Sequence, residues 1–317
     1  MSSAPIDDRM LASASGATAP GWNALPPEYA IPDKPPSLAE AQKYCVRLAT
    51  SHYENFPVVT WFLPKHLHQP FYNVYAYCRI SDDLGDEIGD KQQSLLLLDQ
   101  WEAELAQCYD GEPRHPVFVA LRQTVREFEI PQHEFSDLLR AFRQDQIVTR
   151  YPRFADLLGY CQYSANPVGH LVLYLCGYRD AERQKLSDYT CTALQLANFW
   201  QDVGADFENG RIYLPLEDFA KFGVSEQELA GKRATPQFLA MMKFEVDRAR
   251  EWFQRGLPLA KQVDRRLALD IELFSRGGLA ILRAIERQGY DVLSSRPVIS
   301  KRRKVLLLAR AALGNLL

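Results

Sequence analysis

The sequence predicts an all-α protein, with one helical domain over residues 37–297. Three observations lead to this prediction. Apolar side chains recur at helical spacing in almost every long segment, few segments alternate with the period of two that strands show, and helix caps stand at several segment boundaries. Amphipathic helices bury their apolar faces against one another, so we expect about ten helices around a common interior.

The composition narrows the class of protein. The 317 residues, 47% of them hydrophobic, are typical of a soluble globular protein, and the net charge of −3 gives no sign of a nucleic-acid partner. The six cysteines are scattered without a CxxC pair, which predicts reduced thiols and a cytoplasmic location. We expect neither a membrane-spanning helix nor a secretory signal, because no long apolar run and no basic leader precede the helical region.

The two ends differ from the middle of the chain. Residues 1–36 are rich in Pro, Ala and Ser and are predicted to form a disordered tail. Residues 298–317 combine the basic run Lys301–Lys304 with the apolar run Val305–Leu308. Two alternatives stay open for this segment: an amphipathic helix in peripheral contact with the anionic inner membrane surface, or a final helix docked on the bundle.

Start and stop signals divide the domain into helices. Ser37, followed by Glu40, is a typical N-cap for the first helix, which should end near Ala49. Further helices are expected over His68–Asp86, Ser94–Cys108, Pro116–Glu129, Gln132–Gln146, Phe154–Cys176, Ala181–Phe207, Thr235–Arg255 and Arg265–Gln288. Pro167 lies inside the helix expected over Phe154–Cys176, where it should kink the helix or interrupt its hydrogen bonds.

A polar stripe runs along the otherwise apolar helix expected over Ala181–Phe207. Its members are spaced three, four and four residues apart, which places them on one helix face: Gln195, Asn198, Asp202 and Asp206. Their neighbours in the sequence are Ala, Leu, Phe, Trp and Val. The stripe by itself fits either a solvated face or a face that binds a ligand through oxygen atoms.

A second stripe lies on the helix expected over His68–Asp86. Tyr75, Arg79, Asp82 and Asp86 are spaced four, three and four residues apart, and Asp83 stands at the edge of the same face. An acidic run alone is most often a solvated helix end. Two such stripes on apolar helices favour a common role, and we expect them to oppose each other across a cavity of an antiparallel bundle.

The charges limit what such a cavity holds. Two like charges about 4 Å apart repel by ~4 kcal/mol at an effective dielectric constant near 20, so four or five converging carboxylates require cations. Oxygen ligands without His or Cys select hard ions such as Mg²⁺, which binds substrate phosphates as well. We therefore expect a diphosphate held through Mg²⁺, with Arg79 and Arg211 as direct donors. An apolar cavity suits a hydrocarbon tail, and aromatic faces such as Tyr75 would stabilise the carbocation left by the departing diphosphate.

Three strings carry a family resemblance: YAYCRISDDLGDE, the YCxxxxxxVG segment at Tyr160–Gly169, and LQLANFWQDVGADFENGRIYLP. With them the chain from His52 to Gly289 resembles the squalene/phytoene synthase family of head-to-head prenyl synthases. The resemblance implies an isoprenoid-synthase helical bundle around a central cavity, with two or three Mg²⁺ ions bridging a prenyl diphosphate.

The same resemblance assigns roles to residues. It implies metal ligands at Asp82, Asp83, Asp86, Asn198, Asp202 and Asp206. Substrate contacts are expected at Arg79, Arg211, Tyr213, Asn198, Gln195, Tyr53, Asn55, Tyr160 and Asn166. Catalytic roles are expected for Asp82, Asp86, Asp202, Asp206, Tyr75 and Gln201. Asp145 falls at the position of a further family aspartate.

Departures from the family pattern indicate a branch. The strings ENFP, SANPVG and NFWQDV resemble the hydroxysqualene synthases, and the resemblance implies that presqualene diphosphate is the substrate and that water traps the cation without NAD(P)H. Gln201 stands where many members carry Arg, which argues against the earlier condensation of two prenyl diphosphates. We hypothesise that Gln201 positions the attacking water.

Two other functions remain open at this point. The first is a presqualene diphosphate, squalene or phytoene synthase that condenses two prenyl diphosphates. The second is a non-catalytic isoprenoid-binding assembly factor, although a binding shell has no need of so many converging carboxylates. Functional coupling to other squalene-pathway enzymes is a further expectation from the resemblance.

Overall fold

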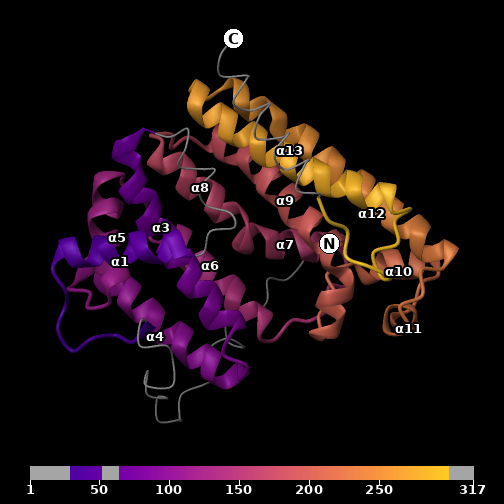
Figure 1. Cartoon of the computed structure of the whole chain (residues 1–317), viewed down its shortest axis with the longest axis horizontal. Coiled ribbons are helices and arrows are strands. Elements are labelled where there is room, and N and C mark those ends of the chain that lie inside the picture. Colours follow the sequence, from indigo (N-terminus) through magenta and orange to yellow (C-terminus); the bar gives the residue numbers. More distant parts are fainter. Residues whose placement is uncertain (1–28, 52–63, 300–317) are drawn as a thin grey trace, which may run out of the picture. The chain divides into compact units, whose positions relative to one another are not determined.

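The computed structural model describes residues 29–51 and 64–299 (Figure 1). These residues form helices and loops, with no β-strand beyond a single bridge between Arg150 and Ile212, so the all-α prediction is confirmed for them. The described residues divide into two compact units: residues 29–51 with 65–147, and residue 64 with residues 148–299. The single domain over residues 37–297 stays a prediction.

The first unit contains five described helices. They are α1 (Leu38–Ser51), α3 (Lys65–Asp86), α4 (Lys91–Asp110), α5 (Pro116–Glu127) and α6 (His133–Asp145). The predicted N-cap is confirmed, because the Glu40 backbone N–H lies 3.4 Å from Ser37 Oγ, and the Glu40 carboxylate accepts from the Ser37 backbone N–H at 2.9 Å.

Helix α3 lies among α1, α4, α5 and α6 and is anchored by its apolar face (Figure 1). Tyr77 is fully buried, packs its ring against Phe135 with centroids 4.9 Å apart, and donates from its hydroxyl to the Phe135 carbonyl at 2.9 Å. Ser81, one turn further, accepts from Trp101 Nε1 at 2.9 Å. These contacts fix the rotation of α3, and hence the direction of its polar face.

The second unit contains the remaining described helices. They are α7 (Phe154–Ser164), α8 (Asn166–Leu175), α9 (Ala181–Glu208), α10 (Leu216–Phe222), α11 (Glu226–Ala230), α12 (Pro236–Gly256), the 3₁₀ helix η4 (Leu257–Lys261) and α13 (Arg265–Arg287). The Thr235 cap is confirmed, because its hydroxyl accepts from the Phe238 backbone N–H at 3.2 Å. The short helices α10 and α11 lie between the helices expected over Ala181–Phe207 and Thr235–Arg255, where the sequence analysis names no element.

Helix α9 is the centre of the second unit and lies alongside α12 and α13 (Figure 1). Two glycines of neighbouring elements allow close approach to it. A Cβ on Gly169 of α8 would overlap Ser187 Oγ and lie 2.6 Å from Cys191 Sγ, and a Cβ on Gly256 would lie 3.0 Å from the Thr190 backbone nitrogen. The Trp200 indole donates to the Glu245 carbonyl of α12 at 3.1 Å. The position of α9 is therefore fixed on several sides.

The sequence predicts one helix over Phe154–Cys176 with a kink or interruption at Pro167. The structure has two helices there, so the single helix is wrong, whereas the predicted interruption is confirmed. The chain leaves helical geometry at Ala165, with φ −122° and ψ −45°, and α8 begins at Asn166. Pro167 stands in the first turn of α8, where a missing backbone N–H breaks no hydrogen bond of the helix.

All six cysteines are free thiols, as expected from their spacing. Within residues 29–51 and 64–299, no helix has the length and hydrophobicity needed to cross a bilayer.

Candidate active site

The first aspartate motif occupies the polar face of α3. Leu84 and Gly85 point into the first unit, where the Gly85 carbonyl accepts from Gln146 Nε2 at 2.8 Å. Arg79 and Asp82 lie on the partly exposed face, and Asp86 is exposed at the end of the helix. The predicted stripe is therefore present on α3. Gln146, the residue after α6, contacts the buried side of the same helix.

Asp83 differs from the other carboxylates of this motif. It is 3% exposed, and its two oxygens face two different partners: the Arg79 guanidinium and the hydroxyl of Tyr29. Arg79 also lies 3.6 Å from Asp82, whose side chain is 48% exposed. Asp83 is thus placed to orient Arg79, while Asp82 and Asp86 remain more accessible to a cation.

The electrostatics of α3 favour such a cation. Burial, and secondly the like charge of Asp86, raise the pKa of Asp82 to about 6. A neighbouring cation would reverse this effect, because it stabilises the ionised carboxylate. Burial also raises the pKa of Tyr75, so its phenol stays protonated.

The second aspartate motif lies on α9. Asn198 is exposed, and Gln195, Asp202 and Asp206 are partly exposed. Phe199 and Trp200 on the flanks are buried, as expected for a polar stripe on an apolar helix. Asn166, from the start of α8, is 8% exposed and accepts from Thr192 Oγ1 of α9 at 3.0 Å.

A segment after α13 covers part of this motif. The Arg296 guanidinium binds Asp202 with two nitrogens: Nε to Oδ1, and Nη2 to Oδ2 at 3.0 Å. The hydrogen bond to Asp202, and then the charges of Asp202 and Asp206, raise the pKa of Arg296. Gln201 is 8% exposed and donates from Nε2 to the Pro297 carbonyl at 2.5 Å.

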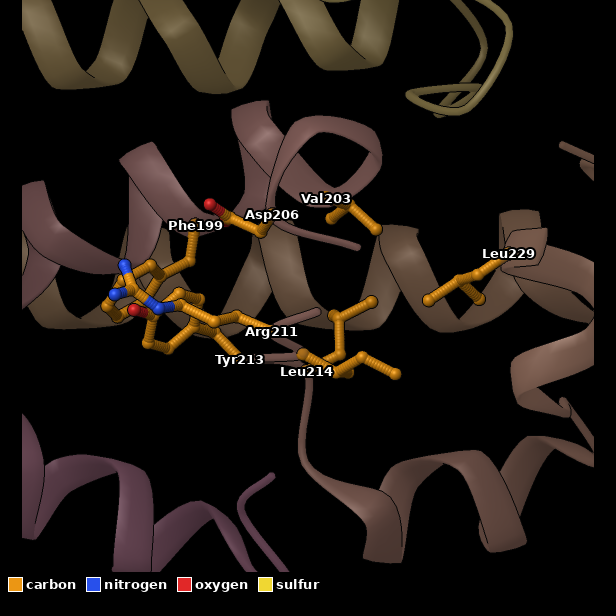
Figure 2. A pocket seen from close by; sticks show the side chains of 8 residues that line it. Phe199, Val203, Asp206, Arg211, Tyr213, Leu214 and Leu229 are labelled. Atoms are coloured by element: carbon orange, nitrogen blue, oxygen red, sulfur yellow. The ribbon is translucent and has the colours of Figure 1, made fainter. Parts of the chain in front are cut away.

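Three of the predicted residues line one small pocket of the second unit (Figure 2). The predicted members are Asp206, Arg211 and Tyr213, and the others are Phe199, Val203, Ile212, Leu214 and Leu229. Figure 2 shows the Arg211 guanidinium at one end and Leu229 at the other. The pocket is therefore charged at one end and apolar at the other.

Backbone pairing positions Arg211 and Tyr213. The Ile212 N–H donates to the Thr149 carbonyl at 2.9 Å, and the Arg211 N–H donates to the Asp206 carbonyl at 2.8 Å. The Tyr213 ring stacks on Phe199 with centroids 3.9 Å apart and lies 5.9 Å from the Tyr160 ring. Tyr160 and Tyr213 are at most 8% exposed, so they form a buried aromatic wall beside the pocket.

The structure brings the predicted residues together within each unit. The opposition of the two stripes across one cavity stays a prediction, because they belong to different units. Tyr53 and Asn55 lie outside the described residues. Tyr29 and Arg296 were missed by the sequence analysis, since each acts from an irregular segment and contacts a motif more than 50 residues away.

Similar proteins are found by family and by sequence. A model of the squalene/phytoene synthase family matches residues 49–303. The 15-cis-phytoene synthase of Synechococcus elongatus is 31% identical over 289 residues, which cover 87% of this chain and 94% of that protein.

Similar proteins are also found among solved structures. The squalene synthase HpnC from Alicyclobacillus acidocaldarius is 46% identical with a TM-score of 0.77, and the match covers 80% of this chain and 95% of that chain. A dehydrosqualene synthase in complex with ligand is 28% identical with a TM-score of 0.78, over 87% of this chain and 96% of that chain.

Proposed function

Because the chain belongs to the squalene/phytoene synthase family, we propose that it is a hydroxysqualene synthase acting on presqualene diphosphate. The carbon–oxygen bond to diphosphate breaks, and its electron pair leaves with the diphosphate. The cyclopropane of the cation then opens and rearranges, water adds to the allylic cation, and one proton is lost. The products are hydroxysqualene and diphosphate, and no electron donor such as NAD(P)H enters the reaction.

The observation that carries this proposal is the ranking of the similar proteins. Identity reaches 46% with the HpnC squalene synthase, against 28% with a dehydrosqualene synthase and 31% with a phytoene synthase. The higher identity favours chemistry that leads to squalene. Gln201, in place of the arginine of many members, supports a step after the condensation.

The carboxylates fit a divalent metal ion, which the family uses to bind diphosphate. Asp82, Asp86, Asp202 and Asp206 offer oxygen ligands, and Mg²⁺ commonly takes one or two carboxylates with the rest from water and phosphate. Among the described residues no three His, Cys, Asp or Glu side chains form a cluster that could hold a metal ion by themselves. We assign two or three Mg²⁺ ions, which when bound would neutralise the leaving diphosphate.

The remaining residues bind and orient the substrate. Arg211 places its charge at the polar end of the pocket, and Arg79 presents its own beside Asp82. The aromatic wall of Tyr160, Phe199 and Tyr213 would exclude water from the hydrocarbon and stabilise positive charge through the ring faces. We assign the same electrostatic role to Tyr75, which stays neutral.

A second function within the family is the condensation of two prenyl diphosphates. The 31% identity with a phytoene synthase over 87% of the chain favours it. A non-catalytic assembly factor has no such support. Burial, and then the like charge of Asp86, raise the pKa of Asp82, and a bound cation would stabilise its ionised form.

The test compares two substrates without a reductant. Purified protein with Mg²⁺ receives presqualene diphosphate in one arm and farnesyl diphosphate in the other, and products are identified by mass spectrometry. We expect hydroxysqualene from the first and no turnover of the second. Presqualene diphosphate formed from farnesyl diphosphate would instead show the condensing function.

Variants assign the reaction to the motifs. Asp82→Ala and Asp202→Ala should each abolish release of diphosphate, and full activity in both would refute the metal assignment. Asp247→Ala is the matched control, because Asp247 is a carboxylate on α12 whose partners are the surface residues Lys243 and Arg250. Gln201→Ala tests the role in positioning water, since an unchanged hydroxysqualene yield contradicts that role.

The surroundings of the enzyme stay predictions. Residues 300–317, which contain most of the basic C-terminal segment, lie outside the described part of the chain, as does most of the predicted tail over 1–36. Peripheral contact with the inner membrane surface is tested by co-sedimentation of the chain with and without residues 298–317 on anionic vesicles. A cytoplasmic location and coupling to other squalene-pathway enzymes are predictions of the same kind.

A further inference from the structure

The segment Asp291–Pro297, here called the strap, follows α13 and has a built structure of its own. The Asp291 carboxylate accepts from the backbone N–H groups of Leu293 at 3.1 Å and Ser294 at 2.9 Å. Gln288, at the end of α13, donates from Nε2 to the Ser295 carbonyl at 2.6 Å. These side-chain bonds replace helical hydrogen bonds and give the strap one defined course.

Two consecutive residues of α9 bind two consecutive residues of the strap. Gln201 binds the Pro297 carbonyl at 2.5 Å, and the next residue of α9, Asp202, binds the preceding residue of the strap, Arg296. Val292 is 2% exposed, and its carbonyl lies 3.7 Å from where a Cβ on Gly204 would stand. The strap therefore packs over more than one turn of α9 beside the second aspartate motif.

The charge at Asp202 is already balanced within the protein. Arg296 binds both carboxylate oxygens, so a metal ion that binds Asp202 competes with the guanidinium for the same negative charge. The Arg296 side chain is 57% exposed and that of Asp202 26%, so water and salt weaken the pair. A contact of this kind competes with a divalent cation without preventing its binding.

We propose that Arg296 is an internal counter-ion that holds Asp202 in the metal-free protein and is exchanged for the divalent cation. Gln201 is the positioning residue that keeps the strap, and with it Arg296, on α9. The proposal rests on the proposed function only in taking Asp202 as a metal ligand. It also gives Gln201 a role different from positioning water, because its amide nitrogen is engaged with the strap.

The test measures metal binding without any substrate. Mn²⁺ is titrated into the full chain, and free Mn²⁺ is followed by its electron paramagnetic resonance signal. Arg296→Met removes the charge and keeps an unbranched side chain, and we expect it to tighten Mn²⁺ binding two- to fivefold. Gln201→Leu, which leaves Arg296 in place, should tighten binding by a smaller factor.

Arg276→Met is the matched control. Arg276 lies on α13 of the same unit, is paired with Glu272 at 2.7 Å, and its loss changes the net charge by the same amount. Equal Mn²⁺ affinities for Arg296→Met and Arg276→Met would overturn the exchange. Circular dichroism verifies that each variant is folded.

A second readout does not depend on affinity. Amide hydrogen exchange of Leu293 and Ser294 should become faster when Mn²⁺ is added to the wild-type chain, and should be fast without metal in Gln201→Leu. Unchanged exchange of these amides with Mn²⁺ would also overturn the proposal. Neither readout involves turnover. The replacement of Arg296 by the cation can therefore be confirmed even if the proposed reaction is wrong, and it can be refuted even if the reaction is right.

Discussion

The two aspartate motifs both place one carboxylate against an arginine, but they obtain the arginine in different ways. On α3 the partner of Asp83 is Arg79, four residues earlier on the same helix, and Tyr29 covers the other oxygen. On α9 the partner of Asp202 is Arg296, which is 94 residues away in the sequence. The first pair is buried at its carboxylate, whereas the second is partly exposed on both sides.

The difference in burial indicates two different roles for an arginine paired with a carboxylate. A buried pair that loses one member leaves an uncompensated charge, so it is suited to hold geometry permanently. An exposed pair is worth little and exchanges easily. We infer that Asp83 serves the orientation of Arg79, while Asp202 remains available to a cation.

The largest effect is expected from Asp83→Ala. It removes the partner of Arg79 and of Tyr29 at once, and we expect the free energy of unfolding to fall by about 3 kcal/mol in urea titrations. Asp82→Ala on the same helix, with its half-exposed carboxylate, should cost well under half as much. Equal losses in the two variants would show that Asp83 is not the buried anchor.

For a buried carboxylate without a paired cation, we expect removal of the charge to raise the stability of the protein. Asp270 on α13 is 3% exposed, neither of its oxygens has a hydrogen-bond partner among residues 29–51 and 64–299, and burial raises its pKa to about 7. A folded-state pKa above the unfolded value means that the native state binds the proton more tightly. Stability should therefore fall as pH rises from about 4 to about 7 and stay level above it.

Asp270→Asn should raise the free energy of unfolding by about 2 kcal/mol at pH 8 and change it little at pH 4. Urea titrations at the two pH values measure this, with the partly exposed Asp247→Asn as control. A loss of stability at pH 8 would indicate that the Asp270 carboxylate has a partner in solution.

The contribution of Tyr29 is expected to be smaller. Tyr29→Phe removes one hydroxyl from a buried carboxylate, which should cost about 1 kcal/mol of unfolding free energy. In a double-mutant cycle the loss should shrink in the Asp83→Ala background, because the hydrogen bond to the Asp83 carboxylate is already absent there. An additive pair of losses would place the effect of Tyr29 elsewhere.

The smallest effect is expected from Asp202→Asn. Its pair with Arg296 is partly exposed, so the unfolding free energy should change by about 0.5 kcal/mol or less. Addition of 1 M NaCl, which on the Debye scale screens charges beyond about 3 Å, should remove even this difference. A cost near that of Asp83→Ala would remove the distinction between the two motifs.

Local patterns in the sequence account for most of the helices and for the stripes. The cap at Ser37, the cap at Thr235 and the polar face of α9 depend on residues within one or two turns, and the structure reproduces them. Pro167 marked a break, but only the structure shows that a new helix begins at Asn166.

The sequence does not reveal contacts made across long separations from irregular segments. Tyr29 precedes the first helix and Arg296 follows the last described one, and neither belongs to a periodic pattern. The buried state of Asp83 was likewise not evident, because helical spacing puts it only at the edge of the stripe. Its burial depends on what covers α3, which no local pattern specifies.

The glycines at positions 169 and 256 have a consequence for attempts to redesign this protein. Side chains at these positions would collide with α9, so libraries that vary them should yield almost only the parental residue. Altered product profiles are then better sought at Leu229 of α11, which lines the apolar end of the pocket and whose size can be changed stepwise. Directed evolution should therefore keep Gly169 and Gly256 and vary Leu229.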